Sequence, residues 1–127
     1  MKHEFADNQY AIITGANQGL GKEYALALSR RKINTILVDL PRKNLKKLSQ
    51  KICDEYNTNS LSYETDLSIQ ENIVSFASWV NENFAICILI NNVGIGGTKE
   101  FVKAELSYIN SILRLNVMAT SILTHQI

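Results

Sequence analysis

The chain has 127 residues, enough for one domain with a single hydrophobic core. Hydrophobic residues make up 46% of it, charged residues 20%, and the formal net charge is +1. These values exclude a disordered chain and a basic surface for nucleic acid or an anionic membrane. The longest apolar run, residues 85–90, is far too short to cross a bilayer, and the first residues resemble no signal peptide, so we expect a cytoplasmic protein.

Short apolar segments alternate with amphipathic segments along the chain. We predict strands at residues 9–14, 35–39, 60–65 and 85–91. Such alternation is typical of a parallel sheet covered by helices. The predicted fold class is therefore α/β, with a single domain over residues 1–127.

Four helical patterns separate or follow these strands, with apolar residues at spacings of three and four. The four stripes are Leu20, Tyr24, Ala27 and Leu28; Leu45, Leu48, Ile52 and Tyr56; Ile69, Ile73, Phe76, Ala77 and Val80; and Ile109, Ile112, Leu113, Asn116, Val117 and Leu123. We expect Pro41 in the first turn of the second helix, and a capping box of Ser68 and Glu71 at the start of the third.

The most informative segment is Thr14 to Gly21, which reads Thr-Gly-Ala-Asn-Gln-Gly-Leu-Gly between the first strand and the first helix. Only glycine allows a tight turn there, a close approach to a pyrophosphate and close packing of the helix on the strand. The helix N-terminus then offers free N–H groups and a partial positive charge to the phosphates. This order of strand, glycine turn and helix predicts a dinucleotide site.

Asp39 ends the second strand. A carboxylate there can accept hydrogen bonds from the adenosine ribose hydroxyls, and it would repel the 2′-phosphate of NADP. Its charge favours NAD, while Arg42 and Lys43 can partly offset that charge, so NADP stays possible. The alternative is a solvated aspartate at the end of a strand.

Two further motifs follow the third and fourth strands. Asp66, with Leu67 after it, can accept a hydrogen bond from an adenine amino group, or it can stabilise the N-terminus of the next helix. The segment Asn91-Asn92-Val93-Gly94 places side-chain amides where they can tie neighbouring strands together. Gly94 lets the chain pass close to a cofactor. An ordinary polar turn is the alternative interpretation of this segment.

Together these motifs resemble the short-chain dehydrogenase/reductase family over about residues 9–127. The matching features are Thr14-Gly-x-x-x-Gly-x-Gly21, Asp39, Asp66-Leu67, Asn91-Asn92-Val93-Gly94 and Asn116-Val117. They fit the N-terminal half of the family's domain, although Val93 stands where the family usually has alanine. The resemblance implies a Rossmann-type doubly wound parallel sheet, truncated to about four strands in the order 3-2-1-4. It also implies an NAD(P)-dependent oxidoreductase that interconverts an alcohol and a ketone by hydride transfer.

The resemblance further implies a role for each matching residue. Gly15, Asn17, Gly19 and Leu20 would line the phosphate and ribose region, and Gly21 would serve chiefly in packing. Asp39 would bind the adenosine ribose, Asp66 and Leu67 the adenine, and Asn92, Val93 and Gly94 the cofactor further along. Asn116 would kink its helix and position a proton-relay water.

The family's catalytic serine and Tyr-x-x-x-Lys pair have no counterpart in this chain. The residues four positions after its five tyrosines are Thr14, Leu28, Ser60, Leu67 and Ile112. Asn116 is the remaining member of the catalytic set, so we expect no hydride transfer by this chain alone. Two alternatives stay open, a non-catalytic dinucleotide-binding or regulatory module and an inactive truncated product.

Other features bear on substrate, partners and metals. The segments 21–25 and 88–94 look like the subgroup that reduces steroids and long-chain 3-oxoacyl thioesters, which commonly prefers NADPH. For the whole protein we expect a small carbonyl or alcohol substrate and a homo-oligomer. Cys53 and Cys87 lack metal-ligand spacing, so we expect reduced thiols and no metal site. The bare apolar edge of the fourth strand predicts marginal stability or self-association of this chain.

Overall fold

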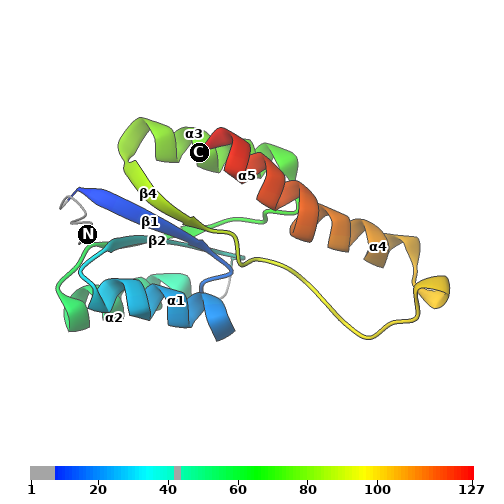
Figure 1. Ribbon diagram of the computed structural model, residues 1–127, viewed down its shortest axis with the longest axis horizontal. Helices are drawn as coiled ribbons and strands as arrows, with labels where there is room; N and C mark the ends of the chain where they lie inside the picture. Colours follow the sequence, from blue (N-terminus) through cyan, green and yellow to red (C-terminus); the bar gives the residue numbers. More distant parts are fainter. Residues whose placement is uncertain (1–7, 42–43) are drawn as a thin grey trace, which may run out of the picture.

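The computed structural model describes residues 8–41 and 44–127, and within them four parallel strands form one sheet (Figure 1). The strands are β1 (Gln9–Thr14), β2 (Asn34–Asp39), β3 (Ser60–Glu64) and β4 (Ala85–Ile90). Their order in the sheet is β3-β2-β1-β4. The predicted fold class and strand order are confirmed, and the predicted strands match to within one residue at each end.

Helices cover both faces of the sheet (Figure 1). The helices α1 (Gly19–Arg30) and α2 (Leu45–Tyr56) lie on one face. The helices α3 (Gln70–Asn83) and α5 (Thr120–Gln126) lie on the other. This is the doubly wound arrangement, and the winding changes direction between β1 and its neighbour β4, which is an edge strand of the sheet.

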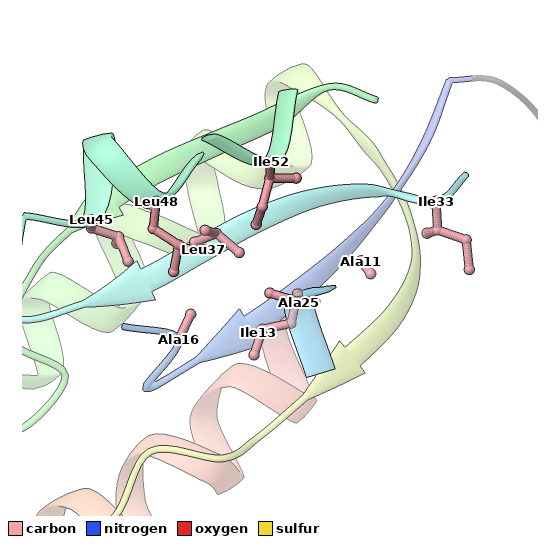
Figure 2. Close-up of a cluster of buried hydrophobic side chains, with 9 residues drawn as sticks. All are labelled: Ala11, Ile13, Ala16, Ala25, Ile33, Leu37, Leu45, Leu48 and Ile52. Carbon is pink, nitrogen blue, oxygen red and sulfur yellow. The ribbon is translucent and has the colours of Figure 1, made fainter. Parts of the chain in front are cut away.

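Two hydrophobic clusters hold these layers together, one on each face of the sheet. Figure 2 shows the first, in which side chains of α1 and α2 pack on β1 and β2. Its buried members are Ala11, Ile13, Ala16, Ala25, Ile33, Leu37, Leu45, Leu48 and Ile52. The second cluster lies between the sheet and the other two helices, and Phe76 is its largest fully buried side chain. Consecutive residues of β1, Ile12 and Ile13, belong to opposite clusters, because successive side chains of a strand point to opposite faces of the sheet.

The predicted apolar stripe of α1 is wrong by one position. Leu20 and Tyr24 are exposed, and the buried face of the helix consists of Gly21, Ala25 and Ser29. These small residues allow the helix axis to come close to the strands, whereas larger side chains on that face would hold it away. Hydrophobicity alone pointed to the wrong face because the contact is made by small residues.

Two predicted helix starts are also wrong. Helix α2 begins at Leu45 and not near Pro41, because Asn44 adopts a left-handed conformation with φ 55° that no α-helix can include. Helix α3 begins at Gln70, and its N-cap residue Ile69 provides no side-chain cap.

The turn before α3 is organised by Asp66 in place of the predicted capping box. The carboxylate of Asp66 accepts the N–H of Ser68 at 2.9 Å, and its carbonyl accepts the side-chain amide of Asn72 at 3.0 Å. Asp66 therefore supplies the local hydrogen bonds that Ser68 and Glu71 were predicted to supply.

The C-terminal part of the described chain is one continuous helical rod. It comprises α4 (Leu106–Ile112), a π-helical segment η2 (Leu113–Ala119) and α5, preceded by a short 3₁₀ turn η1 (Phe101–Lys103). The apolar stripe predicted for residues 109–123 is wrong in its middle part, because Leu113 and Val117 are about half exposed. Leu123, at its end, is fully buried. A π-helix has more residues per turn than an α-helix, so it rotates the apolar face partway along the rod. In the described part of the chain no helix has the length and hydropathy needed to cross a membrane.

We predict that Gly21→Ala destabilises the fold. A Cβ at this position would lie 2.1 Å from the carbonyl oxygen of Gly15 and 2.7 Å from the Nδ2 of Asn92. The helix would have to move off the strand, at a cost of about 1–3 kcal/mol or more in free energy of unfolding. Urea denaturation measures this loss. Gly96→Ala is the matched control, because a Cβ there meets nothing within 4 Å. Equal effects of the two substitutions would contradict the packing role.

We also predict that the 127-residue chain associates through β4. This strand pairs only with β1, and its six residues carry no charge to discourage pairing with another chain. Ile90→Lys should reduce association in sedimentation velocity, since a lysine at the strand end can bring its charge to the open edge. Val74→Lys, on the exposed face of α3, should leave association unchanged. A wild-type chain that stays monomeric and melts sharply at high temperature would contradict this prediction.

Candidate functional site

A cleft of about 540 Å³ opens at the carboxyl ends of the strands, next to the point where the sheet changes direction. This is the place where open α/β sheets bind ligands. Eight of the predicted site residues line it, namely Gly15, Gly19, Asp39, Asp66, Leu67, Asn92, Val93 and Gly94. The fold thus brings together residues that are up to 79 positions apart in the sequence.

The glycine loop after β1 forms the floor of this cleft. Gly15 has φ 64° and Gly19 has φ 55°, a region that other residues adopt only at a cost. Gln18, the N-cap residue of α1, gives the helix no side-chain cap. The first-turn N–H groups of α1 are therefore available to an anion, which is what a pyrophosphate requires.

Four predicted site residues do not line the cleft, and each has another place. The N–H of Asn17 is bonded to the Asp39 carboxylate, and the side chain of Leu20 is 68% exposed. Gly21 is buried and lies close to the backbone of Gly15. Asn116 lies on η2.

Thr14 and Asn92 tie the ends of β1 and β4 together. The hydroxyl oxygen of Thr14 accepts the N–H groups of Asn92 and Val93, both at 2.9 Å. In return the Asn92 side chain donates to the carbonyls of Thr14 at 3.1 Å and of Gly15 at 3.3 Å. The predicted tie between neighbouring strands is therefore present, and it holds the segment after β4 against the glycine loop.

Asp39 lies half-buried between the glycine loop and β3. Its Oδ2 accepts the N–H of Asn17 at 2.9 Å, and its Oδ1 accepts the N–H of Leu40 at 2.8 Å. Each carboxylate oxygen has a further lone pair, so both can still accept hydrogen bonds from a ligand in the cleft. Arg42 and Lys43, which were expected to offset this charge, lie outside the described residues.

Asn116 holds the far wall of the cleft. Its Oδ1 accepts the N–H of Ile95 at 2.9 Å, and its Nδ2 donates to the carbonyl of Ile95 at 2.8 Å. Gly94 passes directly beside it, since a Cβ on Gly94 would lie 3.1 Å from the Asn116 Oδ1. Asn116 itself lies in the π-helical segment η2 (Leu113–Ala119).

Sequence reasoning missed two residues that shape the site. Thr14 was quoted as the start of a motif but not as a site residue, and Ile95 was not singled out. Thr14 could have been found, because a fully buried hydroxyl at a strand end needs hydrogen-bond partners nearby. Nothing in the sequence marks Ile95, which takes part through its backbone groups.

The described residues contain no cluster of three or more histidine, cysteine or acidic side chains that could hold a metal. Cys53 and Cys87 are free and partly buried. Burial raises the pKa of the Cys87 thiol above its usual value, which makes the thiol less reactive. Neither cysteine lines the cleft.

Comparison with curated proteins shows similarity to yeast enzymes. The chain is 30% identical over 123 residues to a very-long-chain 3-oxoacyl-CoA reductase of Candida albicans, covering 94% of this chain and 35% of that protein. It is 32% identical over 119 residues to the protein of the same name in Kluyveromyces lactis, covering 91% of this chain and 34% of that protein. The chain thus spans about a third of the length of these relatives.

Solved structures share the fold. A bulky-bulky ketone specific alcohol dehydrogenase from Comamonas testosteroni superimposes with a TM-score of 0.87 at 28% identity, covering 95% of this chain and 48% of that one. A short-chain dehydrogenase from Sphingobium yanoikuyae in complex with NADPH gives the same TM-score and identity, covering 93% and 46%. The family model described as short chain dehydrogenase matches residues 9–127. On these grounds the chain belongs to the short-chain dehydrogenase family of oxidoreductases.

Proposed function

We propose that this chain forms the dinucleotide-binding part of an NAD(P)-dependent oxidoreductase that interconverts an alcohol and a ketone. One observation carries the proposal. A glycine loop, an uncapped helix N-terminus and a strand-end aspartate converge on one cleft at the change of direction of the sheet. Their chemistry fits a dinucleotide, because the loop admits a pyrophosphate and the carboxylate accepts from ribose hydroxyls.

Different residues of the cleft would bind different parts of the dinucleotide. The N–H groups of α1 would bind the phosphates, Asp39 the adenosine ribose, and Asp66 with Leu67 the adenine. The segment of Asn92, Val93 and Gly94 would border the rest of the molecule. When bound, the nicotinamide ring supplies or accepts the hydride.

We propose NAD as the preferred dinucleotide, on the negative charge of Asp39. A 2′-phosphate about 4 Å from this carboxylate would cost roughly 1–4 kcal/mol. The solved Sphingobium yanoikuyae relative is in complex with NADPH, so NADP is the alternative for this chain. The choice between the two in this chain depends on the surroundings of Asp39.

For the substrate we propose a 3-oxoacyl thioester or another hydrophobic ketone. Support comes from the names of the yeast relatives and of the Comamonas testosteroni enzyme. Besides the residues proposed for the cofactor, the apolar residues Ile95 and Leu115 line the cleft. At its far side Asn116 would orient a water molecule for proton transfer.

Catalysis by the whole protein requires groups that these 127 residues do not provide. A proton donor must lie beside the carbonyl oxygen that receives the hydride, and no tyrosine here has a lysine four residues on. The exposed apolar residues Leu106, Leu113 and Val117 along α4 and η2 support our proposal that the whole protein is a homo-oligomer. The intact mass of the protein from its native source tests whether the whole protein is longer than these 127 residues. A mass well above 14.3 kDa would support a longer enzyme, and 14.3 kDa would support the non-catalytic module.

We predict that the 127-residue chain binds NAD measurably but does not reduce carbonyl substrates with NADH. Isothermal titration calorimetry should show that Gly19→Val weakens binding about tenfold or more, because a β-branched residue is strained at φ 55°. Gly96→Val is the matched control, since Gly96 has no positive φ and an open surrounding. A wild-type chain that binds no dinucleotide would refute the proposal.

A further inference from the structure

The Asp39 carboxylate faces the cleft and also accepts hydrogen bonds from the backbone of this chain. Its Oδ2 takes the N–H of Asn17, in the middle of the glycine loop, at 2.9 Å. The neighbouring backbone bond, from the N–H of Ala16 to the carbonyl of Val38, is longer at 3.2 Å. These two bonds join the loop to the end of β2. The carboxylate therefore helps to set the path of the loop that would receive the pyrophosphate.

The two hydrogen bonds of the Asp39 carboxylate have different surroundings. The bond from Asn17 is partly buried, while the bond from Leu40 is exposed to solvent. If the acceptor is lost, the N–H of Leu40 can turn to water. The N–H of Asn17 has less access to water, so the loss of its acceptor costs more.

Few other contacts hold this part of the loop. Gln18 supplies no side-chain cap to α1, and a Cβ built on Gly19 would meet no atom within 4 Å. The strong ties of the loop are at its start, where Asn92 binds the carbonyls of Thr14 and Gly15. After Gly15, the loop is held by the hydrogen bonds from the N–H of Ala16 to the carbonyl of Val38 and from the N–H of Asn17 to Asp39.

We propose that Asp39 is a positioning residue for the glycine loop, and that the choice between NAD and NADP is coupled to the order of that loop through the Asn17–Asp39 bond. The part of this inference that concerns dinucleotides rests on the function proposed above. The charge of Asp39 disfavours a 2′-phosphate, but its oxygen keeps the loop ready for either dinucleotide. Removing the carboxylate altogether therefore does not convert the site to NADP.

Two substitutions separate the charge from the hydrogen bond. Asp39→Asn removes the charge and keeps one acceptor oxygen. That oxygen would turn to the partly buried N–H of Asn17, leaving the exposed N–H of Leu40 to water. Asp39→Ala removes both the charge and the acceptor. Asp66→Ala is the matched control, because it deletes an equal charge from the same cleft without touching the loop.

Amide hydrogen exchange in the absence of nucleotide tests the bond itself. We expect the Asn17 amide to exchange about tenfold faster in Asp39→Ala, as the loss of a partly buried hydrogen bond implies. In Asp39→Asn and Asp66→Ala its rate should stay within about threefold of wild type. The amides of β1 serve as the internal reference, because faster exchange there would report general unfolding.

Calorimetric titration with NAD and NADP tests the coupling. In Asp39→Asn we expect NADP to bind about tenfold more tightly than in wild type, because the repulsion is relieved and the loop stays ordered. In Asp39→Ala we expect NAD to bind at least about tenfold more weakly, and NADP to show no gain. A merely structural role of Asp39 would weaken both dinucleotides in proportion and leave their ratio unchanged.

Equal NADP gains in Asp39→Ala and Asp39→Asn would overturn the proposal, and so would an unchanged Asn17 exchange rate in Asp39→Ala. If the wild-type chain binds neither dinucleotide, the proposed function fails and the coupling to cofactor choice is refuted with it. The exchange rates still decide by themselves whether Asp39 orders the loop. The two failures are therefore distinguishable.

Discussion

The close approach of α1 to the end of β1 is the contact on which the rest of this structure depends. Gly21 leaves room for the carbonyl of Gly15 and for the side chain of Asn92, which together fill the space a Cβ would take. Because the Asn92 amide donates to Thr14 and Gly15, this one point joins the first strand, the first helix and the fourth strand. No side chain larger than hydrogen is compatible with it.

The same contact decides where the cleft can form. The segment after β4 forms one wall of the cleft. The Thr14 hydroxyl holds it against the glycine loop by accepting hydrogen bonds from the N–H groups of Asn92 and Val93. Asn116 then clamps Ile95 on the other side through two hydrogen bonds to its backbone. Both devices use side chains to satisfy backbone groups at places where no strand pairing is available, which is why amides and a hydroxyl stand there. The polar side chains of the candidate site therefore also hold the backbone around the cleft in place.

The parts of the fold that could be predicted from the sequence are those that depend on local residue patterns. Strands β1 to β4 are found to within a residue, since apolar runs and turn residues are local features. The buried face of α1 was misassigned, because Gly21, Ala25 and Ser29 are buried for their small size and not for hydrophobicity. Helix starts depended on single conformations, such as that of Asn44, which the chain adopts only in its folded context.

Residue types at fixed short spacings were enough to predict the order of strands and helices, the dinucleotide motif and its likeness to one family. Tertiary structure alone decided that the Asp39 carboxylate bonds to the glycine loop and that Ile95 is clamped by Asn116. It also decided where the π-helical turn η2 rotates the apolar face of the last helix. The two hydrogen bonds join residues 22 and 21 positions apart in the sequence, and in each a backbone N–H is the donor. Every residue except proline has this group, so the residue types in the sequence do not indicate which acceptor it will bind.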